Sequence, residues 1–144
     1  MPLTLTTQIT INTSPEEIWT ELIDFKSYPE WNPFINKIEG IPLKGNKLKA
    51  TIADMKFKPL ILESIPNKKL VWLGKLGIKG LFDGEHSFEI IPQQKGCKFI
   101  QNEKFSGILV PFFKNKLMKE TKEGFNSMNK ELKKRVEIKK GLAN

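Results

Sequence analysis

The sequence predicts an α+β fold: a curved antiparallel sheet of about seven strands around one long C-terminal helix, with two short helices after the first strand. Three observations lead to this prediction. The middle of the chain alternates apolar and polar residues, and the last third repeats apolar residues every three or four positions. Between the first strand and this middle part, Pro29 and Pro33 limit the helices to short ones. Alternating segments with short breaks are typical of antiparallel strands, and only the C-terminal helix is long enough to cover such a sheet.

The N-terminal segment favours a strand followed by a helix. Residues Leu3–Ile11 alternate in polarity and are rich in Thr and Ile, which suits a strand. Ser14–Glu17 then provides a capping serine, a proline at the first helical position and acidic residues in the first turn. Because Pro29 and Pro33 follow, at most one further short helical turn is expected.

The central part of the chain alternates with period two and is interrupted by prolines and glycines, which predicts a meander of strands. The predicted strands are Phe34–Glu39, Lys47–Ala53, Lys56–Ile65, Leu70–Leu76, Gly84–Ile91 and Cys97–Phe105.

The C-terminal segment predicts a single amphipathic helix of about 25 residues, from near Pro111 to near Val136. Its apolar stripe consists of Phe113, Leu117, Thr121, Phe125, Met128, Leu132 and Val136. Gly124 interrupts this stripe, and since glycine weakens a helix, space for a ligand or a close approach of Trp72 would explain it.

Composition limits the classes of protein to consider. The net charge is +8, but all basic residues except Arg135 are lysines scattered along the chain, so we expect no specific nucleic-acid partner. A weak attraction to anionic surfaces is a further consequence of this charge. Cys97 is the single cysteine, which excludes an internal disulfide and a cysteine-pair metal site, and we expect no bound metal or cofactor.

The chain is expected to form one domain, residues 1–144, and a monomer. It contains no apolar run of the length that a membrane span requires, and its start lacks the pattern of a signal peptide. We therefore expect a cytoplasmic protein that does not insert into membranes.

Strand parity identifies side chains that face the helix. In the three strands before the helix, the alternation places Trp72, His86, Phe88, Gln101, Glu103 and Phe105 inward. A hairpin loop at Gln93–Gly96 pairs His86 with Glu103 across two strands, close enough to interact.

Three interpretations of this pair remain open: the two side chains satisfy each other, they anchor a ligand carbonyl or hydroxyl in an apolar pocket, or they act as an acid–base pair. The charge of Glu103 would raise the pKa of His86, whereas burial would lower it.

Several segments resemble a known family. SPEEIW at Ser14, YPEWNPF at Tyr28, LVWLG at Leu70, GEHSFEI at Gly84, EKFSGILVPFFK at Glu103 and ETKEGFNSMNKEL at Glu120 occur in the order found in the START-like helix-grip superfamily, SRPBCC. The chain is most similar to its small bacterial and archaeal polyketide cyclase/dehydrase-like members. The resemblance implies a helix-grip fold with a cavity between sheet and helix.

The resemblance also implies that the segment Phe25–Phe34 closes one end of that cavity, with Trp31 and Phe34 as a lid. Alternatively, these aromatic residues complete a solid core. The expected ligand-binding residues are Trp31, Phe34, Trp72, His86, Phe88, Gln101, Glu103, Phe105, Phe113, Leu117 and Thr121.

We therefore expect a binding protein for a small hydrophobic or amphipathic molecule, such as a lipid, isoprenoid or polyketide. One alternative is a cyclase or dehydratase acting on an aromatic polyketide-like substrate, with His86 and Glu103 as its catalytic candidates. A second is a protein-interaction module of the chaperone-activator type.

Overall fold

The computed structural model describes residues 2–52, 54–75 and 80–143, and the side chains of 142 and 143 are not part of that description. It contains a five-stranded antiparallel sheet, in the order β1-β8-β7-β6-β5, and a three-stranded sheet, β2-β3-β4. The strands of the first sheet are β1 (Leu3–Ile11), β5 (Leu60–Ile65), β6 (Lys69–Lys75), β7 (Asp83–Pro92) and β8 (Cys97–Ser106). Those of the second are β2 (Ile35–Glu39), β3 (Lys49–Ile52) and β4 (Met55–Phe57).

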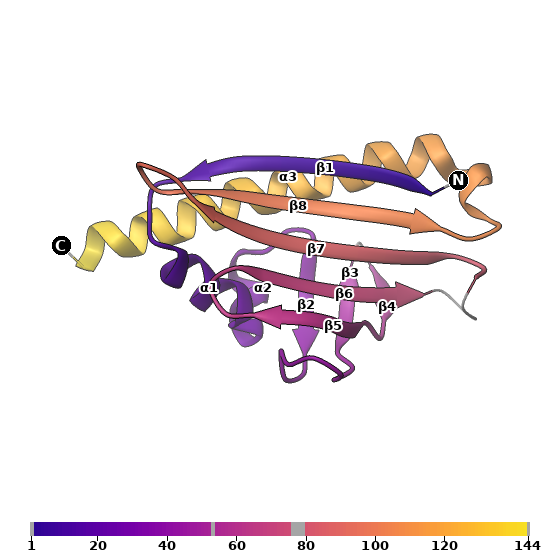
Figure 1. The fold of residues 1–144 in the computed structure, drawn as a ribbon, viewed down its shortest axis with the longest axis horizontal. Coiled ribbons are helices and arrows are strands. Elements are labelled where there is room, and N and C mark those ends of the chain that lie inside the picture. The colour runs from indigo at the N-terminus through magenta and orange to yellow at the C-terminus, as the bar shows by residue number, and fades with distance from the viewer. Residues whose placement is uncertain (1, 53, 76–79, 144) are drawn as a thin grey trace.

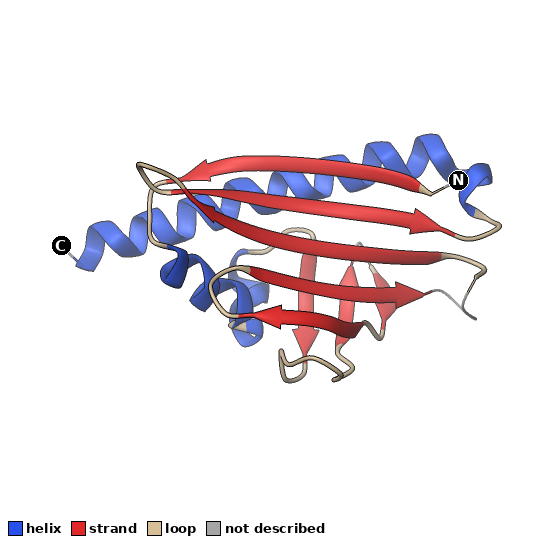
Figure 2. Cartoon of the chain, in the orientation of Figure 1, coloured by secondary structure: helices blue, strands red, loops and turns tan. Residues whose placement is uncertain are grey.

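The helices are α1 (Pro15–Ile23), the 3-10 turn η1 (Phe25–Ser27), α2 (Tyr28–Trp31) and α3 (Val110–Ala143). Helix α3 runs along one face of the five-stranded sheet, as Figure 1 shows. The short helices and the small sheet lie on the same side of the five-stranded sheet as α3, and in Figure 2 the small sheet is seen behind β5 and β6. The predicted fold class is confirmed, and none of the described helices is long and apolar enough to cross a bilayer.

The sheet differs in detail from the single meander that was predicted. The segment predicted as the strand Lys56–Ile65 is divided into β4 and β5, which belong to different sheets. Pro59 lies at the division, and because proline has no N–H to donate, it interrupts the ladder there. An isolated bridge pairs Leu60, at the start of β5, with Lys47, which lies two residues before β3. The ends of two predicted strands, Ala53 and Leu76, lie outside the described residues.

Helix α3 extends beyond the predicted end near Val136, and its last turns are tied to the N-terminal part of the chain. Glu21 of α1, only 4% exposed, pairs with Arg135 at 2.7 Å and with Lys139. The Lys140 ammonium donates to the Asn12 carbonyl at 3.1 Å. These contacts, which a local pattern does not reveal, keep the helix ordered past its apolar stripe.

The local signals at α1 are those that the sequence predicts. The Ser14 hydroxyl accepts a hydrogen bond from the Glu17 N–H, and Pro15 occupies the first turn. One face of α1, with Ile18 and Leu22, packs into the core that lies between the large sheet and the central part of α3.

Candidate functional site

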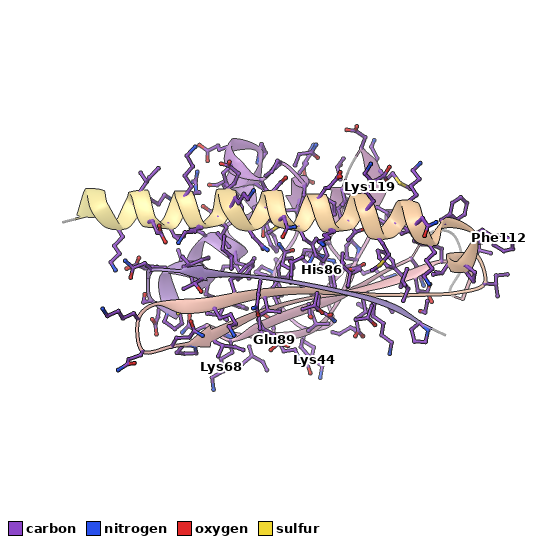
Figure 3. All side chains as sticks on the ribbon, turned by 90° about the horizontal axis from the view of Figure 1, so that it is seen from above. Lys44, Lys68, His86, Glu89, Phe112 and Lys119 are labelled. Carbon is purple, nitrogen blue, oxygen red and sulfur yellow. The ribbon has the colours of Figure 1, made fainter. Side chains whose placement is uncertain are left out.

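The candidate site lies on β7 and β8, on the face of the sheet that α3 covers. His86 is opposite Glu103 and Phe88 is opposite Gln101, so the predicted register is confirmed. The His86 Nδ1 atom lies 3.7 Å from Glu103 Oε2. Figure 3 shows His86 between α3 and the sheet, well inside the molecule.

Aromatic rings surround His86. Its imidazole stacks on Phe88 and Phe125, with ring centroids 4.1 and 4.7 Å away, and it meets Trp72 edge to face at 5.3 Å. Only 2% of the residue is exposed. Burial therefore lowers the pKa of His86 to about 3, although the hydrogen bond to Gln101 acts in the opposite direction. Of the two opposing effects that the sequence led us to expect, burial prevails, and Glu103 is not among the causes of the shift.

A chain of buried polar groups fixes which nitrogen of His86 carries the proton. The Gln101 Nε2 group donates to Asn129 Oδ1 at 2.7 Å and to the Phe125 carbonyl at 3.4 Å. Its Oε1 atom consequently faces His86 Nε2, at 2.9 Å. Since an amide oxygen only accepts, Nε2 must hold the proton and Nδ1 must be free to accept. Asn129 is held in turn, because its Nδ2 group donates to the Thr7 hydroxyl at 3.1 Å.

Glu103 is the second group of the site. Its side chain is 13% exposed, and its Oε2 atom is buried without a hydrogen-bond partner among the described residues. The carboxyl group lies over Gly84, where a Cβ would overlap Oε1. Desolvation first, and then the negative charge of Glu85, raises the pKa of Glu103 to about 8. At neutral pH the pair is thus a carboxylic acid facing an unprotonated imidazole nitrogen, and it is no ion pair.

The two residues expected to form a lid are packed differently. Trp31 is 8% exposed and belongs to the core, with its ring 5.2 Å from that of Tyr28. Phe34 is half-buried and meets Phe125 edge to face at 5.5 Å. A Cβ on Gly124 would overlap the Phe34 ring, so close approach of Phe34 accounts for the glycine in α3. The sequence suggested either space for a ligand or a close approach of Trp72 as the cause, and the nearest neighbour of this position is instead Phe34.

The other predicted site residues are distributed along the interface of α3 with the sheet. Phe105 and Thr121 are buried, and Leu117 is half-buried. Phe113 is 48% exposed, so it does not point into the core as its place in the apolar stripe suggested. The structure therefore brings together the central residues of the prediction and separates those near the start of α3.

Sequence reasoning missed Asn129 and Thr7, which complete the polar chain. Both follow the inward patterns: Asn129 is one helical turn after Phe125, and Thr7 shares the face of Leu5 and Ile9 on β1. A polar residue on a face otherwise apolar was the available signal in each case.

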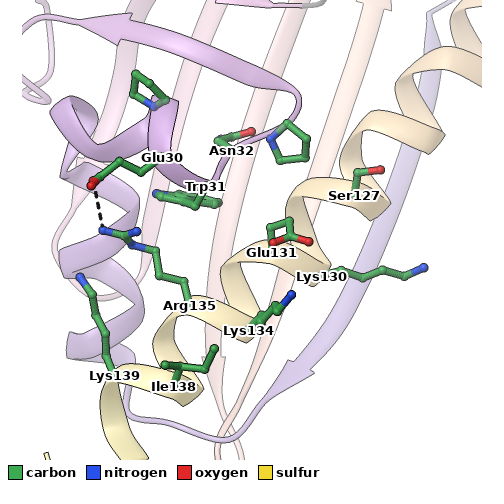
Figure 4. A pocket seen from close by; sticks show the side chains of 12 residues that line it. Glu30, Trp31, Asn32, Ser127, Lys130, Glu131, Lys134, Arg135, Ile138 and Lys139 are labelled. Atoms are coloured by element: carbon green, nitrogen blue, oxygen red, sulfur yellow. Dashed lines mark ion pairs between the residues drawn. The ribbon is translucent and has the colours of Figure 1, made fainter. Parts of the chain in front are cut away.

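The surface of the described residues includes two pockets outside the candidate site. The larger, of about 780 Å³, lies between α2 and the C-terminal half of α3 and is lined by Trp31, Lys130 and Lys134 among others. Figure 4 shows it, with the Glu30 to Arg135 ion pair of 3.5 Å at one side. The smaller, of about 250 Å³, lies on the three-stranded sheet. Neither pocket is lined by His86, Gln101 or Glu103.

No group of three or more potential metal ligands occurs within residues 2–52, 54–75 and 80–143.

Comparisons with known proteins define the class. The family model described as polyketide cyclase/dehydrase and lipid transport matches residues 2–137, so the chain belongs to this family. The expected SRPBCC membership is confirmed. A comparison with curated protein sequences finds no match.

Solved structures with the same fold come from distant relatives. A START superfamily protein from Mycobacterium smegmatis has a TM-score of 0.65 and 21% identity, covering 93% of this chain and 97% of that one. The di-domain ARO/CYC StfQ from the steffimycin biosynthetic pathway has a TM-score of 0.78 and 12% identity, covering 98% and 52%. A point mutant of norcoclaurine synthase from Thalictrum flavum, in complex with a transition state analogue, has a TM-score of 0.74 and 14% identity, covering 97% of each chain. At these identities the likeness establishes the fold alone.

Proposed function

We propose that the protein binds a small hydrophobic or amphipathic molecule between the five-stranded sheet and α3, with Glu103 and His86 holding its polar group. The observation that carries the proposal is the Glu103 carboxyl group, whose Oε2 atom is buried without a partner and lies 3.7 Å from an imidazole nitrogen that can only accept. A buried polar atom without a partner is costly, and a ligand group placed between the two would satisfy it.

The geometry favours an uncharged hydroxyl group on the ligand. At 3.7 Å the two side chains are too far apart for a good mutual hydrogen bond. A hydroxyl can accept from the protonated carboxyl of Glu103 and donate to Nδ1 of His86, satisfying both. A ligand carboxylate would have to enter the same apolar surroundings with its charge, which is unfavourable. The rings of Trp72, Phe88 and Phe125 would then contact the apolar part of the ligand.

Access requires a movable element, and Phe34 has the suitable position. Its half-exposed ring fills the space over Gly124 and contacts Phe125, which stacks on His86. Rotation of Phe34 away from Gly124 would open space at the end of this aromatic stack. We infer that Phe34 acts as the lid, while Trp31 supports it from the core.

The proposal can be tested with an aromatic alcohol and the matching acid. We expect 2-naphthol to bind more tightly than 2-naphthoate at neutral pH, by roughly tenfold, because only the acid carries a charge into the site. Titrations followed by tryptophan fluorescence would measure both affinities, and native mass spectrometry of the purified protein would reveal a co-purified molecule.

Glu103→Leu should weaken naphthol binding, because a leucine side chain cannot donate a hydrogen bond to the hydroxyl group. Glu89→Leu, a matched change on the outer face of β7 (Figure 3), should leave the affinity unchanged. Equal affinity in Glu103→Leu and in the native protein would contradict the proposed anchor. So would the absence of any bound molecule in both titrations and in native mass spectrometry.

A cyclase or dehydratase remains the second candidate, supported by the raised pKa of Glu103. A carboxylic acid with a pKa of about 8 is still protonated at neutral pH and can give its proton to a departing hydroxyl group. His86 would accept the proton from the adjacent carbon, so that water leaves and a double bond forms. However, an imidazole whose pKa is about 3 is a weak base, which favours binding over catalysis. If the native protein turned over a hydroxylated polyketide substrate and His86→Ala did not, catalysis would be favoured over binding alone.

A further inference from the structure

A group of exposed apolar side chains lies where β8 leads into α3. We call Ile108, Phe112 and Phe113 the apolar corner; they are 71%, 79% and 48% exposed. Figure 3 shows Phe112 projecting at the end of the molecule where α3 begins. Single exposed apolar residues are common, but here three large ones lie within six positions, and exposed apolar side chains that gather in one place often mark an interaction site.

The backbone of the apolar corner is held in place by a neighbouring segment. The Ile108 N–H donates to the Gly80 carbonyl and the Leu109 N–H to the Leu81 carbonyl, each at 3.1 Å. Gly107 has a φ of +121°, and a Cβ there would overlap the Leu81 carbonyl. The backbone of the corner is therefore already ordered. A partner that binds its side chains does not incur the entropic cost of ordering a free segment.

Exposed lysines follow the apolar corner in the first turns of α3. From Gly107 to Lys119 the sequence contains Lys114, Lys116 and Lys119 and no acidic residue. All three lysines are exposed, and none forms an ion pair with another described side chain. Helical spacing places Lys116 and Lys119 on the same face as Phe112.

We propose that the apolar corner docks onto the surface of an anionic phospholipid bilayer. Aromatic side chains are favourable at the level of the lipid headgroups, and nearby lysines are attracted by anionic lipids. A second copy of the chain is a poor occupant, because pairing two such corners would bring six lysines together in a protein whose net charge is already +8. The attachment is peripheral, since it involves the side chains of one corner, and it does not depend on the ligand site.

The test is co-sedimentation of the full chain with lipid vesicles at low salt. We expect binding to vesicles of phosphatidylcholine with phosphatidylglycerol, little binding to phosphatidylcholine alone, and a decrease as salt is added. Phe112→Ser should lower the constant for partition onto these vesicles roughly tenfold, because the transfer of one aromatic side chain contributes about that factor. Ile108→Ser should act in the same direction.

The matched control is Leu43→Ser. Leu43 is 59% exposed in the loop between β2 and β3, beside Lys44, and should have no effect on vesicle binding. All of these positions are exposed, so their substitution leaves the core intact. No binding to anionic vesicles, or an equal loss in Leu43→Ser and Phe112→Ser, would overturn the proposal. A dimer in solution that Phe112→Ser dissociates would also overturn it, and would assign the corner to self-association.

Discussion

The two titratable groups of the candidate site are both uncharged at neutral pH, and for the same physical reason. His86 and Glu103 are removed from water, which disfavours the protonated imidazole and the ionised carboxyl group alike. The proximity of the two groups does not make them ionise, because an electrostatic attraction between them would require a charge on both. What remains is a donor and an acceptor, an arrangement that suits a neutral polar ligand group.

Asn129 is the residue that orients this pair from a distance, and its replacement tests the polar chain. Asn129→Leu leaves the Thr7 hydroxyl without its donor and removes the shorter of the two hydrogen bonds made by Gln101 Nε2. We expect a loss of about 1–3 kcal/mol in the free energy of unfolding, measured with urea.

The same variant should mix the two tautomers of His86, visible in its ¹⁵N chemical shifts, whereas the native protein should show the Nε2–H form alone. Asn126→Leu, on the half-buried side of α3, is the control that should change neither quantity. An unaltered tautomer in Asn129→Leu would show that Gln101 is oriented by other contacts.

At the scale of elements, the ring of Phe34 joins the segment before β2 to α3 through its contacts with Gly124 and Phe125. Gly124→Ala on its own should be destabilising, because the new methyl group overlaps the Phe34 ring. In Phe34→Ala the same substitution should instead stabilise by about 1 kcal/mol, the normal preference of a helix for alanine. Urea unfolding of the four proteins in this cycle measures the change of sign.

Gly141→Ala is the internal reference for that cycle. A Cβ at this position of α3 meets nothing within 4 Å, so only helix propensity acts there. If Gly124→Ala stabilises the native protein as much as Gly141→Ala does, Phe34 moves freely and is not fixed against the helix.

The short helix α2 gives a further prediction, because Trp31 is nearly buried. Trp31→Ala should lower the free energy of unfolding by about 3–5 kcal/mol, as truncation of a core aromatic residue does. The lid role expected for Trp31 from the sequence would instead weaken ligand binding more than stability. Measuring unfolding and naphthol affinity on the same variant distinguishes the two, with Phe34→Ala as the comparison.

For the whole molecule, the two buried groups make stability depend on pH in opposite directions. The pKa of Glu103 is raised from 4.5 to about 8, so the folded state binds more protons between these values and stability falls as pH rises through them. The pKa of His86 is lowered from 6.5 to about 3, so stability falls as pH drops below 6.5 towards 3. Maximal stability is therefore expected at mildly acidic pH.

Glu103→Gln should remove the loss of stability on the alkaline side. Between about pH 4.5 and pH 6.5 the opposite effects of Glu103 and His86 cancel, so in the native protein we expect the decrease, of about 2 kcal/mol, between pH 6.5 and pH 8. Over that range the profile of Glu103→Gln should be nearly flat, and below pH 6.5 its stability should fall because only His86 still titrates. Urea unfolding at several pH values measures it. The control Glu89→Gln should behave as the native protein, and a flat native profile would mean that Glu103 is ionised in the folded state.

The sequence by itself determined the elements and much of the site's geometry. Alternation placed His86 and Glu103 on one face, and the hairpin loop at Gln93–Gly96 set their register, because both rules act over neighbouring residues. The cap at Ser14 and the apolar stripe of α3 likewise depend on local spacing.

Only the tertiary structure decided the charge of the pair, the cause of Gly124 and the true end of α3. The pKa of His86 depends on burial beneath Phe125 and on the hydrogen bond to Gln101. Gly124 is required because the Phe34 ring occupies the place of a Cβ, and the last turns of α3 are fixed by Glu21. Each partner is far away along the chain, and its effect depends on distance and exclusion of water in three dimensions. Neither quantity is contained in a local pattern of residues.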